Sequence, residues 1–228
     1  DSLPYNVGLF GRAADDARQT DTFDQRARPS ADVLFVIDNS GSMGDEQQAL
    51  SQNFGAFMQY ALSLDFDYHL AATTTDVGDL GVFLSSSSGV RVITPETPFP
   101  AENFAEIVNP GINGSGDERG LEAMELALSP PSIDNENAGF LRPEAFLTVI
   151  VISDEEDSSA EALAYYEQFL LNVKGARAAN LVSFNAIAEP GTRYETFATT
   201  FQGQFVDIGQ PTWASALTAL GTNAFSFR

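Results

Sequence analysis

Short apolar runs alternate along the chain with segments whose apolar residues recur every three or four positions. The two clearest runs are residues 31–37 and 146–152, which consist mostly of aliphatic and aromatic side chains. Runs of this kind are typical of strands that are buried on both faces. Shorter runs rich in β-branched or aromatic residues predict further strands at residues 69–75, 90–93, 181–187 and 205–208.

The intervals between these runs carry the periodicity of amphipathic helices. Apolar stripes predict helices over residues 50–62, 121–128, 163–173 and 213–220. Strands that alternate with helices usually form a parallel sheet, because each helical crossover returns the chain to the same end of the sheet. The pattern therefore predicts an α/β protein with a Rossmann-like, three-layer fold, in which helices flank a central, mostly parallel β-sheet on both faces.

The same pattern divides the chain into three regions. Residues 1–30 are polar and irregular, and we expect an N-terminal arm or flanking strand segment with a short strand at 20–25. Residues 31–221 form the predicted domain, and residues 222–228 alternate like the start of a C-terminal flanking strand. No apolar run reaches the length of a membrane span, so we expect no membrane insertion of this segment. The first residues form neither an initiator nor a charged signal region, so we expect a piece of a larger chain.

Acidic residues dominate the charge of the predicted domain. The chain has 32 acidic and 11 basic residues, a formal net charge of −21, and no cysteine. Between residues 29 and 173 there are 24 acidic residues against three arginines, so this stretch carries the whole net charge. Such a charge repels nucleic-acid phosphates and anionic lipids, and we expect neither as a partner. Without cysteine, disulfides, thiolate metal sites and thiol catalysis are excluded.

Three polar loops follow the predicted strands or begin predicted helices. In an open parallel sheet, ligands bind beyond the carboxyl ends of the strands. Asp38, Ser40 and Ser42 follow the first strand at alternate positions, and Gly41 allows a tight turn between them. Oxygen ligands of this kind suit a hard divalent cation such as Mg²⁺, Ca²⁺ or Mn²⁺. The other two loops are Gly114–Gly120, before the second helix, and Ser153–Ser158, after the long central strand.

These loops, taken in order, resemble the von Willebrand factor type A family, whose metal-ion-dependent adhesion site is built from three such loops. The resemblance covers about residues 31–221. It implies that Asp38, Ser40 and Ser42 are metal ligands, and that Asp154 is the acidic ligand after the central strand.

The second loop departs from the family pattern. The family places a threonine three residues before a glycine, and counting back from Gly120 gives Asp117. Ser115 or Glu118 could serve in its place if the loop has another shape. An additional direct carboxylate would weaken the attraction of the cation for an acidic partner and would favour Ca²⁺.

Further acidic residues near these loops leave two interpretations open. The acidic cluster of Glu155, Glu156 and Asp157 could hold a second cation, together with Asp76 or Asp79. Alternatively, they form a solvated rim that deepens the negative potential around the first cation, and we favour this interpretation.

The resemblance implies a function in recognition without enzymatic activity. The site would bind a divalent cation, Mg²⁺ or Ca²⁺ with Mn²⁺ as a further option. An acidic group of a protein or another ligand would complete the coordination shell of this cation. It also implies a bacterial adhesin or surface-anchored protein, located outside the cell or at its surface, with the periplasm and the outer membrane as further options. The first alternative is a structural module in a larger surface assembly, which uses its metal for stability.

A weaker alternative is a magnesium-dependent phosphoryl-transfer hydrolase of the haloacid-dehalogenase type, with Asp38 as the nucleophile. The second acid of that family's first motif would fall at Ser40, and its expected lysine has no candidate before Asp154. A catalytic triad is not expected, because His69 is the only histidine and no Gly-x-Ser-x-Gly sequence occurs.

Overall fold

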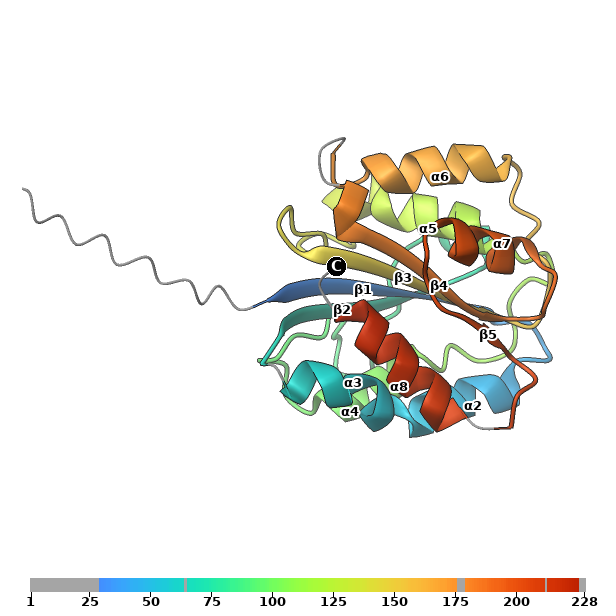
Figure 1. The fold of residues 1–228 in the computed structure, drawn as a ribbon. Coiled ribbons are helices and arrows are strands. Elements are labelled where there is room, and N and C mark those ends of the chain that lie inside the picture. Colours follow the sequence, from blue (N-terminus) through green and yellow to red (C-terminus); the bar gives the residue numbers. More distant parts are fainter. Residues whose placement is uncertain (1–28, 64, 176–178, 212, 226–228) are drawn as a thin grey trace, which may run out of the picture.

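Five parallel strands form the central sheet of the computed structural model, which describes residues 29–63, 65–175, 179–211 and 213–225 (Figure 1). In chain order the strands are β1 (Ser30–Ile37), β2 (Asp67–Thr74), β3 (Phe146–Ser153), β4 (Val182–Ala188) and β5 (Phe205–Asp207). Their spatial order is β2-β1-β3-β4-β5, so the two longest apolar runs of the sequence are neighbours in the interior of the sheet. The predicted α/β class and the parallel sheet are confirmed.

Alternate residues of β1 point into two separate hydrophobic cores. Val33, Phe35 and Ile37 belong to one core, and Leu34 and Val36 belong to the other. All five side chains are fully buried, and burial of each contributes roughly 1.5–3 kcal/mol. This two-sided burial explains why the run is continuously apolar rather than alternating with polar residues.

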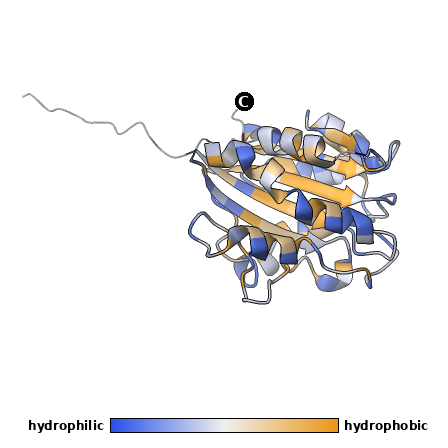
Figure 2. Cartoon of the chain, turned by 90° about the horizontal axis from the view of Figure 1, so that it is seen from below, coloured by the Kyte–Doolittle hydropathy of each residue, from blue (hydrophilic) through white to orange (hydrophobic). Residues whose placement is uncertain are grey.

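Helices cover both faces of the sheet. On one face lie α2 (Gly44–Gln52), α3 (Phe54–Ser63), α4 (Pro100–Ile107) and α8 (Trp213–Ala224), and on the other lie α5 (Gly120–Leu128), α6 (Leu163–Asn172) and α7 (Arg193–Thr200) (Figure 1). Short 3-10 helices occur at η1 (Val77–Asp79), η2 (Ser132–Asp134) and η3 (Ala179–Leu181). Figure 2 shows the hydrophobic strands inside, between helices and loops that carry most of the hydrophilic residues. The predicted three-layer arrangement is therefore confirmed.

Two local predictions differ from the structure. The apolar stripe over residues 50–62 spans two helices, because the chain leaves helical geometry at Asn53, whose side-chain amide donates to the carbonyl of Ala49. The strand expected at 90–93 is reduced to one isolated antiparallel bridge between Leu70 and Ile93.

The predicted strand at the C-terminal end is wrong for residues 222–225. Helix α8 continues to Ala224, and the Phe225 amide donates to the Gly221 carbonyl at 3.1 Å. The helical period prevails because Leu217, Leu220 and Ala224 lie buried on one face of α8. Residues 226–228 lie outside the described residues, as does the arm at 1–28 with its predicted strand at 20–25.

Backbone hydrogen bonds hold the carboxyl ends of three strands at one edge of the sheet. The Asp38 amide donates to the carbonyl of Ile152 at 2.9 Å, and the Thr75 amide donates to that of Ile37 at 3.1 Å. The residues that follow β1, β2 and β3 therefore begin side by side. This edge, called the carboxyl edge below, is where the sequence predicts a cation.

Candidate metal centre

Asp38 is the fixed point of the first loop. Its carboxylate is fully buried, with Oδ1 accepting from the Ser40 amide at 2.8 Å and Oδ2 accepting from the Ser153 hydroxyl at 2.7 Å. The Ser40 and Ser42 hydroxyls lie 3.3 Å apart, so both stand at the same point of the loop. Each Asp38 oxygen has a further lone pair, so these contacts leave the carboxylate able to bind a cation.

One polar side chain and one backbone hydrogen bond tie the first loop to the segment that precedes α5. The Gln47 amide nitrogen donates to the carbonyls of Asp38 and Gly111, at 2.9 and 3.0 Å, and its oxygen accepts from the Gly111 amide. The Gly114 amide donates to the carbonyl of Asn39 at 2.8 Å. A β-carbon at Gly114 would lie 2.1 Å from the Asn39 side-chain oxygen, so this close approach requires glycine.

The second loop brings Glu118, rather than Asp117, to the interior. The Asp117 side chain is 53% exposed and pairs with Arg119, with 2.7 Å between Oδ2 and Nη2. Glu118 is only 1% exposed, and its Oε2 accepts a short hydrogen bond from the Thr75 hydroxyl. Of the two acids that the sequence offered for this position, Glu118 is the one enclosed by the site.

The electrostatic environment of Glu118 is unfavourable to its charge. Burial raises the pKa of Glu118 to about 7, and the negative charges of Asp38, Glu155 and Asp76 add to this effect, while the hydrogen bond from Thr75 opposes it. The pKa of Glu155 is also raised, by burial and by the charges of Asp38 and Asp154. Several carboxylates from all three loops therefore destabilise one another at this edge.

The loop after β2 is tied to the second loop through Asp76, and the role of Asp76 or Asp79 at a second cation stays a prediction. Asp76 accepts from the amides of Gly78 and Ser115 through its two oxygens, at 2.8 and 3.2 Å, so it fastens the 3-10 helix η1 to the second loop. The Ser115 hydroxyl in turn accepts from the Asp117 amide at 3.0 Å. Asp79 is exposed and accepts from the Thr74 hydroxyl at 2.5 Å.

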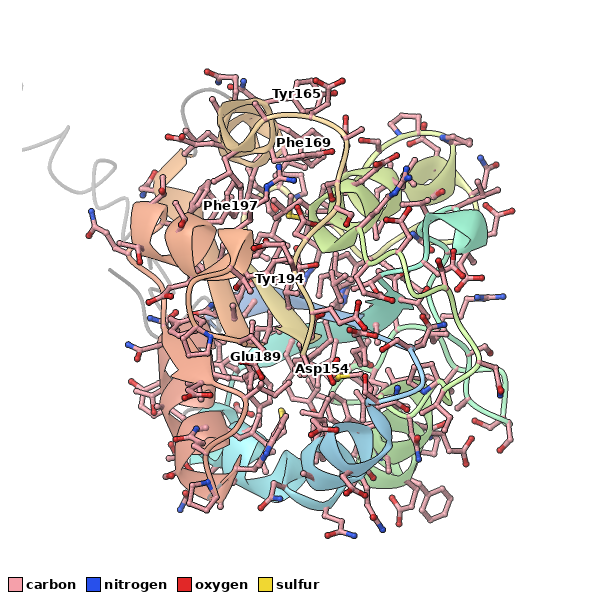
Figure 3. The ribbon with its side chains drawn as sticks, turned by 90° about the vertical axis from the view of Figure 1, so that its right-hand side faces the viewer. Asp154, Tyr165, Phe169, Glu189, Tyr194 and Phe197 are labelled. Carbon is pink, nitrogen blue, oxygen red and sulfur yellow. The ribbon has the colours of Figure 1, made fainter. Side chains whose placement is uncertain are left out.

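The third loop supplies Asp154, which is partly buried near the middle of the edge in Figure 3. Within the described ranges, Oδ1 of Asp154 and Oε1 of Glu118 are buried acceptors that have no hydrogen-bond partner. Buried polar atoms nearly always find a partner, so each of these two oxygens requires an explanation. A hard cation would satisfy both, and the donor set of carboxylate and hydroxyl oxygens fits Mg²⁺, Ca²⁺ or Mn²⁺.

Asp157 belongs to the scaffold of the third loop. Its Oδ1 accepts from the Leu121 amide at 3.2 Å and from the Ser159 hydroxyl at 2.7 Å, and its Oδ2 pairs with Arg193 at 3.0 Å. These contacts cap the first turn of α5. Because its carboxylate serves this purpose, a second cation involving Asp157 and Glu155 stays a prediction without a structural observation in its favour.

The candidate ligands interact as neighbours and do not form a closed coordination shell. In the part of the chain covered by the structure, no three histidine, cysteine, aspartate or glutamate side chains gather closely enough to hold a metal by themselves. Coordination by the predicted residues, Asp117 included, therefore stays a prediction.

Sequence reasoning missed three residues that shape the centre. Ser153 holds the Asp38 carboxylate, Thr75 holds Glu118, and Gln47 holds the backbone of the first loop. Two of them could have been predicted from the sequence, because Ser153 and Thr75 are hydroxyl residues at the carboxyl ends of predicted strands. Gln47 could have been noticed as a polar residue one helical turn before Leu50, on the apolar face.

His69 and Asp32 lie near the opposite end of the sheet, since they pair in register close to the start of β1. His69 Nδ1 is 3.0 Å from the carbonyl of Phe140, and 3.9 Å from Oδ1 of Asp32. This location separates the histidine from the carboxyl edge.

Comparison with known proteins finds similarity only at the level of solved structures. No protein-family model matches the sequence, and no curated protein matches it. Three structures of proximal thread matrix protein 1 from the mussel byssus are similar at 15–16% identity, with TM-scores of 0.47–0.48, and one of them is described with a zinc-occupied MIDAS motif. The match covers 88% of this chain and 47–48% of those chains, so this chain spans about half their length. These values mark a distant likeness, and we base the functional proposal on the residues of this chain.

The raised pKa of Glu118 predicts an unusual pH dependence in chelating buffer. Between the ordinary carboxyl pKa near 4.5 and about 7, the folded chain holds a proton that the unfolded chain has lost. Stability should therefore fall as the pH rises through this window, by up to about 3 kcal/mol. Glu118→Gln should remove this fall and raise the melting temperature at pH 8. The control Glu136→Gln removes an exposed acid just after η2 and should leave the fall in place. An unchanged pH profile in Glu118→Gln would contradict the interior position of the carboxylate.

Proposed function

We propose that this chain is a divalent-cation-dependent binding module whose cation site lies at the carboxyl edge of the sheet. The observation that carries the proposal is the pair of buried acceptors without partners, Glu118 Oε1 and Asp154 Oδ1, on two of the loops at this edge. An uncompensated buried carboxylate is costly, and a cation removes that cost.

The residues that would hold the cation are oxygen ligands from all three loops: Asp38, Ser40, Ser42, Glu118 and Asp154. Asp38 anchors the set, and Glu118 takes the second-loop position that the sequence assigned to Asp117. When bound, the cation supplies positive charge to these carboxylates and a position at which an oxygen atom of a partner can bind. Three carboxylates favour Ca²⁺ over Mg²⁺, because Ca²⁺ accepts more oxygen ligands in less regular geometry.

The partner that fits this site is a protein or another ligand that presents an acidic group, which would complete the coordination shell. The resemblance supports such an adhesive role without enzymatic activity, outside the cell or at its surface, as part of a larger chain of bacterial type. None of the described helices is long and apolar enough to cross a bilayer.

A second candidate function is favoured by Glu118 itself. With three carboxylates around one divalent ion, the loaded site keeps a negative charge, which weakens the attraction for an acidic partner. The cation would then act mainly as a clamp between the three loops, in a structural module of a larger assembly. Partner binding that survives chelation would favour this candidate over the first.

A cation titration of the wild-type chain tests the proposal directly. The melting temperature should rise with Ca²⁺, Mg²⁺ or Mn²⁺ in a saturable manner, and calorimetry at 25 °C should give one binding event. Sodium chloride at matched ionic strength is the control, because general screening also relieves repulsion among surface carboxylates. If divalent cations do no more than the salt control, the proposal fails.

The hydrolase alternative has its own test. Turnover of a phosphate monoester in Mg²⁺ that disappears in Asp38→Asn would favour phosphoryl transfer over recognition. We expect no turnover, since Asp38 is held from both sides by Ser40 and Ser153 and is fully buried.

A further inference from the structure

Arg193, the first residue of α7, binds the third loop at several points beyond Asp154. Its Nη1 donates to the carbonyls of Asp157 and Ser159, at 3.2 and 2.8 Å, and its Nη2 donates to that of Glu161 at 2.6 Å. The Arg193 amide also donates to the Glu156 carboxylate at 2.8 Å. The guanidinium therefore holds segment 157–161 against the start of α7, and the backbone amide of the same residue binds Glu156.

The same contacts reach the second loop through Ser158. This residue lies between the two carbonyls that Nη1 binds, and its amide donates to the carbonyl of Glu118 at 2.7 Å. On the other side, the Arg119 amide donates to the carbonyl of Thr75 at 3.2 Å. Hydrogen bonds therefore fix the backbone around Glu118 to the loop after β2 on one side and to the segment that Arg193 binds on the other.

Asp154 stands in a similar position between two fixed points. Before it, Ser153 ends β3 and bonds to Asp38. After it, Glu156 and Asp157 are fixed by Arg193, the latter also through an ion pair of 3.0 Å. No direct contact joins Arg193 to Glu118 or Asp154, but the backbone of Glu118 bonds to Ser158 and Asp154 precedes Glu156 and Asp157, all within or next to the segment that Arg193 binds.

Tyr194, the next residue of α7, extends the connection to α5. Its buried hydroxyl accepts from the Gly120 amide at 3.1 Å, and a β-carbon at Gly120 would lie 2.5 Å from that oxygen. Figure 3, which faces the carboxyl edge, shows Tyr194 on the α6 side of Asp154. Helix α7 thereby holds the second and third loops together from one side.

We propose that Arg193 is a positioning residue of the cation site, which sets the distance between Glu118 and Asp154 without binding the cation. This inference rests on the proposed function. It has a distinctive consequence, because the charge and the position of Arg193 act in opposite directions. As a positive charge near the edge, Arg193 repels a cation, so its removal should tighten binding by simple electrostatics. As a positioning residue, its removal should weaken binding.

The test compares the Ca²⁺ dissociation constants of Arg193→Gln, Arg193→Lys and the wild type, measured by calorimetry well below each melting temperature. Loss of residues that orient metal ligands typically costs 10–100-fold in affinity, so we expect a rise of at least about tenfold for Arg193→Gln. Arg193→Lys should give a smaller rise, since one ammonium cannot reach all the carbonyls. Arg91→Gln is the matched control: it removes the same charge from an arginine that bonds to the Phe83 carbonyl away from the three loops. It should leave the constant unchanged or slightly lower.

The outcomes separate the two proposals. If the wild type binds no divalent cation, the proposed function fails. If the wild type binds Ca²⁺ and Arg193→Gln binds equally well or more tightly, the proposed function stands and the positioning role is overturned. A lower melting temperature with an unchanged dissociation constant would also overturn it, because that result describes a purely structural arginine.

Discussion

Asp38→Asn should abolish the rise in melting temperature that divalent cations produce in the wild type. A cation at about 100 times its dissociation constant stabilises a folded protein by about 2.7 kcal/mol. For a chain of this size, that corresponds to a rise of roughly 5–10 °C. The asparagine keeps an oxygen that can accept from the Ser40 amide, so the loop should remain folded while the anchoring charge is lost.

Two comparisons make the Asp38 result specific. In chelating buffer, the melting temperature of Asp38→Asn should equal or exceed that of the wild type, since one of several repelling carboxylates has gone. Asp134→Asn, which removes an exposed charge on η2, should keep the full response to cations. A cation response in Asp38→Asn as large as in the wild type would remove Asp38 from the site.

Asp32→Ala should destabilise the chain by about 3–5 kcal/mol, whether or not a cation is present. Asp32 is 0% exposed at the start of β1, where Lys174 Nζ lies 2.9 Å from Oδ2 and Arg142 Nε lies 2.8 Å from Oδ1. Lys174 is itself buried, and burial lowers its pKa while Asp32 opposes that effect. Without Asp32, the ammonium would be buried without its partner, so the melting temperature should fall by roughly 10 °C or more.

Asp67→Ala is the matched control for Asp32. Its carboxylate pairs with the same arginine, with 2.8 Å between Oδ2 and Nη1, but its side chain is 43% exposed. Exposed ion pairs contribute at most about 1 kcal/mol, so this loss should be several times smaller in urea unfolding. Equal losses of unfolding free energy in the two variants would show that the buried ion pairs of Asp32 contribute no more to stability than the exposed pair of Asp67.

The sequence predicted the layers and the parallel sheet because those depend on periodicity, which each strand and helix carries in its own residues. It also located the three loops, since the ends of parallel strands meet at one edge. It could not choose between Asp117 and Glu118, because adjacent residues exchange places with a small rotation of the loop. That choice depends on Thr75 and Ser158, which reach the loop from segments about 40 residues away.

The C-terminal prediction failed for a related reason. Residues 222–228 alternate like a strand in the sequence, but α8 continues to Ala224 and buries Leu217, Leu220 and Ala224 on one face. The ion pairs of Asp32 could not be predicted either, because its partners Arg142 and Lys174 lie more than 100 residues away in the sequence.

The start of α5 has a further consequence for how the domain opens. The amides of Gly120, Leu121 and Glu122 donate to the Tyr194 hydroxyl, the Asp157 carboxylate and the Ser159 hydroxyl. None of these acceptors is local: the first turn of the helix is completed entirely by residues that follow it by 36 to 74 positions. Fraying of α5 and release of the third loop are therefore a single cooperative event, and this edge of the molecule should open and close as one unit rather than loop by loop.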